Sequence, residues 1–416
     1  MGFKVFAPMV MLVVLSAAPG VRATAPEDAV LMREATELRS RGTSGLQTFL
    51  KKHSQTLSQP ETRTALDTLC QQRDCYASQL YWYTDLEQAK AAARLSGKPI
   101  LSLRLLGKLN EDLSCANSRF FRVALYPNAE VSAFLRDRYI LHWESVRPVP
   151  QITIDFGDGR KLQRTLTGNS IHYILDASGR PVDALPGLYG PQAFLKHLKQ
   201  SGELARKVSR LPESERDRFL RQYHRDRLTA VQTQWEQELK QLGIATPPRL
   251  LEGQLTPEQT PTAAQAAPIA VTKMMVETPL LRALRLASET RQTLTDLTDQ
   301  SAWSRLAALH QEEARLDTNS LALIRAKRSR TPNPPEPLEA TVRNFEFTMA
   351  LDTVRNEYLV RSQLHQWFWQ GRNTQEVKAL NEQVYAQLFL TPSSDPWLGL
   401  SPLNSYSAIE NDGMKP

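Results

Sequence analysis

The chain has 416 residues, of which 41% are hydrophobic and 23% are charged, an ordinary globular composition that is long enough for two or three domains. Its formal net charge of +7 is modest for this length, and basic residues are interleaved with acidic ones. The tightest basic cluster, at residues 325–330, borders a proline-rich stretch and is best explained as a solvated helix end. We therefore expect no nucleic-acid partner, and leave open only a loose peripheral attraction to anionic lipids.

The first residues indicate export. Lys4 precedes an apolar run at residues 5–18, and Val21-Arg22-Ala23 fits the small-x-small pattern of a cleavage site. The run is short for a spanning helix, which needs about 20 residues. We expect residues 1–23 to be a signal peptide and the mature protein to be exported, periplasmic or in the cell envelope. An uncleaved anchor is the alternative.

Residues 24–200 divide into a helical segment and a segment of mixed helices and strands. Residues 24–75 form a helical segment, because apolar residues recur there at helical spacing. Residues 76–200 mix helices and strands. Helices are expected at 85–95, directly after Cys115, at 131–138 and at 191–198. Strands are expected at 100–106, 139–143, 152–156, 161–166, 171–175 and 182–185, with Gly157-Asp158-Gly159 as a hairpin turn.

From residue 203 onward the strand signals stop. A long amphipathic helix is expected at 203–243, followed by a Pro/Ala/Thr/Gln-rich linker at 244–270. A helical region at 271–390 shows helical patterns at 271–294, 299–327, 338–369 and 374–390. Residues 391–416 form an irregular tail, whose Trp397 and Leu398 we expect to fold back onto the helices.

The chain has three cysteines, and export permits disulfides. Cys70 and Cys75 are five residues apart, so on a regular helix they point away from each other, about 500° of rotation apart. A bond between them needs a break in the helix, which Arg73-Asp74 offers. We expect Cys70–Cys75 with Cys115 free, and keep Cys75–Cys115 as the alternative. No second cysteine pair and no His-x-x-x-His follows, so we expect no zinc at these cysteines.

Cys115 lies in residues 114–121 (SCANSRFF), a few residues after the strand expected at 100–106. A thiol at a helix N-terminus meets free backbone N–H groups that stabilise the thiolate, and Arg119 adds to this effect. Glu111 and Asp112 oppose it. The alternative is an inert thiol packed as a small apolar residue.

The segment at about 81–198 resembles the thioredoxin-like fold, most of all exported thioredoxin-like domains. The matching residues are Trp82, Asp85-Leu86-Glu87-Gln88-Ala89, Gly97-Lys98-Pro99-Ile100, Cys115, Glu130-Val131, Tyr139, Leu175-Asp176-Ala177-Ser178-Gly179-Arg180-Pro181-Val182 and Gly190-Pro191-Gln192-Ala193-Phe194-Leu195. The resemblance implies an α/β thioredoxin-like domain, a mixed central sheet flanked by helices with an extra β-hairpin. A mainly α-helical C-terminal region follows it.

The resemblance implies a site, with two departures. In such domains a Cys-x-x-Cys precedes a Glu-Val pair, and counting back thirteen residues from Val131 reaches Ser118. Cys115 then takes the nucleophile position, while Ser118 replaces the resolving cysteine and prevents a two-cysteine cycle. Ser170 occupies the cis-proline position, so we expect a trans bond there. Asn169 and Ser170 would form the substrate-facing loop.

Two functions follow. In the first, Cys115 acts as a single thiol in disulfide exchange or thiol trapping with a thiol- or disulfide-containing partner in the envelope, which makes the chain an oxidoreductase without cofactor or metal. In the second, the thioredoxin-like unit is a non-catalytic scaffold whose helical region binds a partner. The sequence assigns no oligomeric state. The remaining candidates are expected to be structural: His142 and His172 as hydrogen-bonded strand residues, His310 with Glu313 on a solvated helix face, and His365 with Trp367, Phe368 and Trp369 as a packed helix end.

Overall fold

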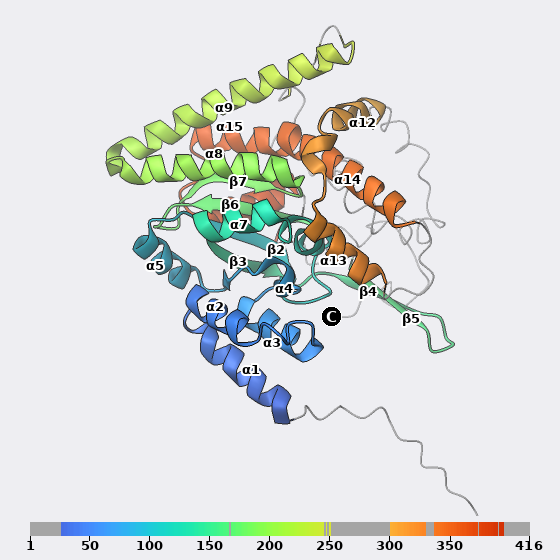
Figure 1. Cartoon of the computed structure of the whole chain (residues 1–416). Helices are drawn as coiled ribbons and strands as arrows, with labels where there is room; N and C mark the ends of the chain where they lie inside the picture. Colours follow the sequence, from blue (N-terminus) through green and yellow to red (C-terminus); the bar gives the residue numbers. More distant parts are fainter. Residues whose placement is uncertain are drawn as a thin grey trace, which may run out of the picture.

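A computed structural model describes residues 26–165, 168–244, 247, 249–250, 300–329, 337–372, 374–389 and 391–394 (Figure 1). The expected signal peptide, most of the 244–270 linker, the helix expected at 271–294 and the tail beyond residue 394 lie outside the described residues. Among the residues that are described, no helix combines the length and apolar character needed to cross a membrane.

A mixed five-stranded sheet forms the centre of the molecule, in the order β1-β3-β2-β6-β7. Its strands are β1 (Trp82–Tyr83), β2 (Ile100–Leu106), β3 (Ile140–Arg147), β6 (Ser170–Leu175) and β7 (Pro181–Pro186). The strands β1 and β2 run parallel to β3, whereas β6 runs antiparallel to both β2 and β7. Every residue of β2, β6 and β7 is buried, so both faces of the sheet are covered.

Four helical segments cover the sheet: α5 (Leu86–Ser96), α6 (Ala116–Phe120) continued by the π-helical η1 (Phe121–Leu125), α7 (Ala129–Arg138) and α8 (Pro191–Arg210). Local chemistry fixes their ends. The side chains of Asp85 and Asn128 accept the backbone N–H groups of the first turns of α5 and α7. Gly97 ends α5 in the left-handed conformation, at φ 67°.

The expected hairpin is present as β4 (Gln151–Asp155) and β5 (Lys161–Thr165). It forms its own two-stranded sheet, and its strands are largely solvent-exposed. In Figure 1 it extends away from the body of the molecule.

The N-terminal helices α1 (Pro26–Arg39), α2 (Thr43–Lys52), α3 (Pro60–Cys70) and α4 (Cys75–Ser78) enclose a small core of their own. Figure 1 shows α1 to α3 beyond one side of the sheet and α9 and α15 on the other. The buried members of this second core are Ala35, Leu38, Leu46, Phe49, Ala65, Leu66, Leu69, Cys70, Cys75 and Tyr81.

The C-terminal region is largely helical and shares one core with the sheet. Its elements are α9 (Glu213–Gln241), α12 (Gln300–Leu309), the 3₁₀ helix η5 (Gln311–Ala314), α13 (Thr318–Arg328), α14 (Leu338–Arg355), the π-helical η6 (Asn356–Arg361), α15 (Ser362–Gln370), α16 (Val377–Gln383) and the π-helical η7 (Val384–Leu388). The helix expected at 338–369 is present as the continuous run α14-η6-α15.

Two helix boundaries differ from the sequence expectation. The helix expected at 203–243 is divided, because its first residues continue α8 to Arg210 and Pro212 starts α9. Proline lacks an N–H and disfavours helical geometry in Leu211, which precedes it. The helix expected at 299–327 is also divided, because Asp317 accepts the Ser320 amide and starts a new helix.

Candidate functional site

Cys115 lies at the N-terminus of α6, just after β2. Its amide donates to the Leu106 carbonyl at the end of that strand (3.1 Å). The Ser118 amide donates to Cys115 Sγ (3.4 Å), so the sulfur itself caps the helix. The expectation that Cys115 starts a helix is confirmed.

The surroundings of Cys115 exclude solvent. The exposed fraction of Cys115 is 0%, and Ser118 is equally buried. Burial raises the pKa of the Cys115 thiol, and the hydrogen bonds from Ser118 and the charge of Arg119 offset only part of that rise. The thiol is therefore protonated at neutral pH, the form that is neither nucleophilic nor metal-binding.

Ser118 contributes its hydroxyl to the helix start. The hydroxyl oxygen lies 2.7 Å from Ser114 Oγ and 2.8 Å from the Cys115 carbonyl oxygen. One partner is a side-chain oxygen and the other a backbone oxygen, and both belong to the turn that starts α6. This turn is thus stabilised by a serine at the position where a two-cysteine site would need a second sulfur.

The loop at Asn169 and Ser170 lies beside α6. Ser170 Oγ accepts from Asn117 Nδ2 (3.1 Å), and the peptide bond before Ser170 is trans, as expected. Both loop residues are buried. The structure therefore brings the loop next to the Cys115 helix, although neither residue is accessible to a substrate.

A C-terminal segment, residues 384–389 with Thr391 and Pro392, packs over this loop, and we call it the C-terminal cover. Asn169 Nδ2 donates to Thr391 Oγ1 (2.9 Å), and the Tyr385 hydroxyl donates to the Asn169 carbonyl (3.2 Å). The guanidinium of Arg147 donates to the carbonyls of Thr391 (2.9 Å) and Pro392 (3.2 Å). The side of the sheet that holds Cys115 is therefore closed by residues that follow Cys115 by more than two hundred positions in the sequence.

The cysteine pairing matches the first expectation. A disulfide joins Cys70 and Cys75, with the Cα atoms 6.3 Å apart, and Cys115 is free. Helix α3 ends at Cys70, where Gln71 and Asp74 adopt positive φ values, so the chain breaks next to the expected Arg73-Asp74 position. This break turns the two sulfur atoms toward each other.

A second group of polar residues is buried where β7 meets α8, α9, η6 and α15, and we call it the buried charge network. It contains Asp183, His197, Ser201, His224, Glu357, Arg361 and His365. The Arg361 guanidinium donates to Asp183 (2.9 Å) and to both oxygens of Glu357 (3.0 and 3.2 Å), and lies 2.6 Å from His197 Nδ1. The Ser201 hydroxyl also donates to Asp183.

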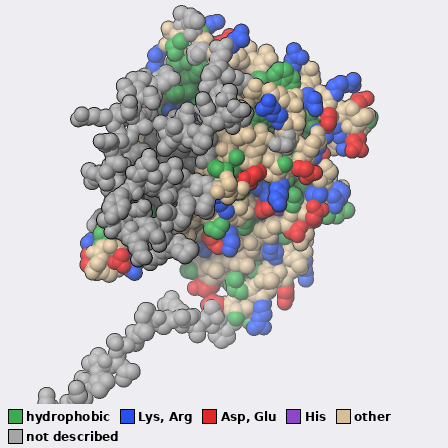
Figure 2. All heavy atoms as spheres, turned by 180° about the vertical axis from the view of Figure 1, so that it is seen from behind, with side chains coloured by type: hydrophobic (Ala, Val, Ile, Leu, Met, Phe, Trp, Pro, Cys, Tyr) green, Lys and Arg blue, Asp and Glu red, His purple; other side chains and the backbone are tan. Residues whose placement is uncertain are grey.

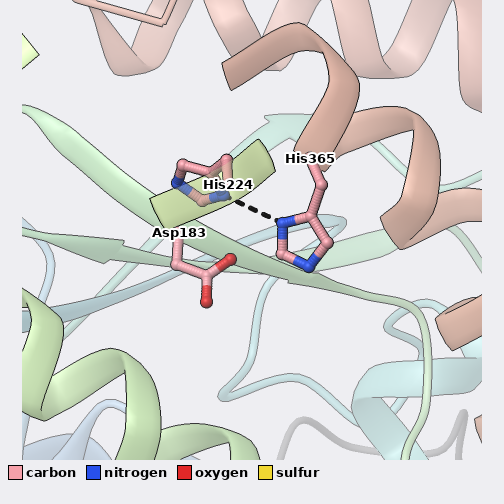
Figure 3. A group of neighbouring side chains, drawn as sticks. All are labelled: Asp183, His224 and His365. Atoms are coloured by element: carbon pink, nitrogen blue, oxygen red, sulfur yellow. Dashed lines mark hydrogen bonds between the residues drawn. The ribbon is translucent and has the colours of Figure 1, made fainter. Parts of the chain in front are cut away.

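Two histidines face each other within this network (Figure 3). His224 Nδ1 lies 2.9 Å from His365 Nδ1, and His224 Nε2 lies 2.9 Å from the Val182 carbonyl. Burial lowers the pKa of His224 to about 4 and the pKa of His365 well below its usual value. Both rings are neutral at physiological pH. No sequence pattern predicts this group, because Asp183, His224 and His365 are far apart in the chain and share no short-range spacing.

The other histidines are structural, as expected. His142 Nδ1 is hydrogen-bonded to Ser102 Oγ and His172 Nε2 to the Tyr126 hydroxyl, both across 2.8 Å. His310 differs from the solvated position expected for it, because it is largely buried between Glu238 and Glu313.

A shallow groove of 430 Å³ lies on the outer side of α9, next to the end of α15. Of the aromatic residues near His365, Trp367 and Phe368 are buried, whereas Trp369 is 40% exposed and lines this groove. The other lining residues are Ser214, Asp217, Arg218, Arg221, Gln222 and Arg225. Elsewhere, on the described surface seen in Figure 2, acidic and basic side chains are mixed.

No protein-family model, no curated protein and no solved structure matches the chain.

Proposed function

We propose that the chain is an exported, thioredoxin-like interaction protein whose α/β unit is a non-catalytic scaffold. The thioredoxin-like part of this proposal is supported by the mixed five-stranded sheet, the helices that cover it and Cys115 at the start of the helix that follows β2. The export part rests on the signal-like pattern at residues 1–23.

The observation that carries the proposal is the burial of Cys115. Disulfide exchange requires a thiolate that reaches the sulfur of another molecule in line with its disulfide. Cys115 has no exposed surface, its pKa is raised, and the C-terminal cover closes the adjacent loop. Ser118 offers no sulfur to release a mixed disulfide. These features favour a packed core cysteine over a reactive one.

We assign the partner contact to the groove on α9. Arg218, Arg221 and Arg225 are exposed along one side of the helix, and Arg225 lies 6.0 Å from the centre of the Trp369 ring. Asp217, the only acidic residue that lines the groove, is paired with Arg180. A groove with three arginines and one exposed tryptophan favours an acidic segment of a partner protein, because aromatic and arginine side chains dominate binding at such contacts.

Thiol labelling of the native chain tests the scaffold proposal. A maleimide should leave Cys115 unmodified in the native protein and should modify it completely in urea, with mass spectrometry of the intact chain as the readout. The double variant Arg147→Ala/Thr391→Val removes polar contacts of the C-terminal cover and should accelerate labelling, whereas Arg164→Ala on the exposed hairpin should not. Rapid labelling of the native protein at pH values below the free thiol pKa of about 8.5 would instead support single-thiol exchange.

A further inference from the structure

Asp183, His224 and His365 come together where three distant segments meet. Asp183 lies on β7, His224 on α9 and His365 on α15, and one ligand-type atom from each lies within 4.8 Å of the other two. Figure 3 shows the carboxylate and both imidazole rings pointing toward a common centre. Two imidazole nitrogens and a carboxylate oxygen are a donor set that transition metals such as zinc prefer.

The hydrogen bonds of His224 prepare it as a ligand. Because its Nε2 faces the Val182 carbonyl at 2.9 Å, the single proton of the neutral ring is on that nitrogen. Its Nδ1 therefore presents a lone pair toward His365. Metal-binding histidines usually donate their other ring N–H to a carbonyl or carboxylate in this way, which fixes the ring and its tautomer.

Asp183 is prepared in a similar way. The Arg361 guanidinium donates to the carboxylate across 2.9 Å and the Ser201 hydroxyl donates to it as well, so the buried carboxylate is held in its charged form. Arg361 and Ser201 occupy one of its oxygens, Oδ2, and the other, Oδ1, accepts the amide of Ala184. Each oxygen has two lone pairs, so the carboxylate keeps acceptor capacity for an ion.

The balance of buried charge favours a cation. Arg361 is the only fully buried cation of the described network, and it is shared by two carboxylates, Asp183 and Glu357. Arg227 approaches Glu357 to 3.9 Å and retains 24% of its side-chain exposure, so it partly balances Glu357. The charge of Asp183 is balanced only by Arg361, which Asp183 shares with Glu357. Buried charge without full compensation is costly, and a bound cation removes that cost.

Several polar atoms around the network have no hydrogen-bond partner among the described residues. They are Arg361 Nε, Arg227 Nε, His365 Nε2, Tyr189 Oη and Tyr223 Oη. The Tyr189 ring lies 5.4 Å from the His197 ring and the Tyr223 ring lies 5.1 Å from the His224 ring, so both tyrosines lie next to the network. Native proteins pair nearly all buried polar atoms, so a concentration of unpaired ones indicates ordered water, which can accept from the Arg361 and Arg227 N–H groups and also serve as a metal ligand.

We propose that Asp183, His224 and His365 bind one divalent transition-metal ion of the zinc class, with water as a further ligand. The two Nδ1 atoms are 2.9 Å apart, and tetrahedral bonds of about 2.1 Å place such atoms about 3.4 Å apart, so the rings must separate by about 0.5 Å. The proton that His365 Nδ1 donates to His224 moves on metal binding to His365 Nε2, which has no partner among the described residues. The ion links β7, α9 and α15, and its burial makes it structural. It holds the C-terminal helices against the edge of the sheet, independently of the state of Cys115.

Metal content of the purified full-length chain tests this site directly. The protein is dialysed against a chelator, then against Zn²⁺ or Co²⁺, and the bound metal is measured by mass spectrometry. We expect one ion per chain, the visible absorption of four-coordinate Co²⁺, and a rise in Tm of about 5 °C or more on reloading. A chain that retains no stoichiometric metal and shows an unchanged Tm overturns the proposal, without any variant being needed.

Variants then locate the ion. Asp183→Asn and His365→Gln keep the approximate shape of the side chains and should each abolish stoichiometric binding. The matched control is His310→Gln, which removes another buried imidazole that is bonded to Glu238 and Glu313 and should leave one ion bound. Loss of the metal in His310→Gln but not in His365→Gln would place the ion elsewhere and refute the assignment.

Discussion

The guanidinium of Arg361 donates a hydrogen bond to the carboxylate of Asp183 across 2.9 Å, although 178 residues separate them and neither is exposed to solvent. The contact joins η6 of the C-terminal helices to β7 at the edge of the sheet. The same guanidinium binds Glu357, so one cation holds two carboxylates in place. Such pairs are costly to break because each lost partner leaves a buried charge behind.

Replacing this guanidinium should strongly destabilise the protein. Arg361→Met keeps much of the side-chain length but leaves Asp183 and Glu357 without their cation, at an expected cost of about 3–5 kcal/mol in the free energy of unfolding. Urea denaturation followed by circular dichroism measures the change. Arg160→Met, at the exposed tip of the hairpin, is the control and should stay within about 0.5 kcal/mol of the wild type. A similarly small effect of Arg361→Met would show that the buried charge network contributes little to the free energy of unfolding.

His310 should make stability depend on pH. Burial opposes its protonation, but the hydrogen bonds that the protonated ring donates to Glu238 and Glu313 outweigh burial and raise the pKa of His310 to about 9. Because the folded pKa exceeds the unfolded value of about 6.5, this contribution is fully present below pH 6.5 and is lost as the pH rises through 9. Its size is about 3 kcal/mol.

Chemical denaturation at pH 6 and pH 9.5 measures this contribution. The wild type should lose more stability than His310→Gln over that interval, and the two should converge at high pH. Parallel curves for the two proteins would mean that His310 does not change its protonation state on folding.

Loss of the disulfide should destabilise the N-terminal helices selectively. Cys70 and Cys75 belong to the second core, separate from the core around the sheet. Closing so short a loop lowers the conformational entropy of the unfolded chain, which stabilises the folded state by about 2 kcal/mol. In Cys70→Ala/Cys75→Ala, hydrogen exchange should accelerate in α1 to α3 and stay unchanged in β2 and β6. Cys115→Ala is the control that keeps the bond, and equal acceleration throughout the double variant would contradict the separation of the two cores.

Introducing a second cysteine next to Cys115 should not produce redox activity. Ser118→Cys places a thiol one turn from Cys115, but both positions are fully buried. We expect no acceleration of insulin disulfide reduction by dithiothreitol above the wild-type chain, since a protein disulfide cannot reach either sulfur. Clear turnover by Ser118→Cys would mean that the C-terminal cover opens in solution, and would favour the catalytic alternative.

The groove on α9 should bind acidic peptide. A fluorescein-labelled peptide rich in glutamate, with one aromatic residue, should bind the full chain with an affinity that falls as salt is added. Arg221→Glu/Arg225→Glu should weaken binding at least about tenfold, equivalent to about 1.4 kcal/mol. The control Arg160→Glu/Lys161→Glu carries the same charge change on the hairpin, and equal weakening in both variants would point to net charge instead of the groove.

Local patterns of the sequence predicted much of the local structure. Gly157-Asp158-Gly159 identified the hairpin because only certain residues adopt its turn geometry. The position of Cys115 at a helix start and the Cys70–Cys75 pairing followed from residues close in the chain, and the trans bond before Ser170 followed from the absence of proline there. Apolar periodicity did not predict the break before α13, where Asp317, a residue type favoured at the N-cap, accepts the Ser320 amide.

The sequence by itself therefore determined most helices and strands and the Cys70–Cys75 disulfide, because each depends on contacts between residues close in the chain. Only the tertiary structure decided what surrounds them. Cys115 is buried, with Thr391 and Pro392 closing the neighbouring loop, and Asp183 meets His224 and His365 because separate helices pack on one sheet edge. Burial and the pKa of a side chain depend on these distant partners, and no local spacing records which segments will pack together.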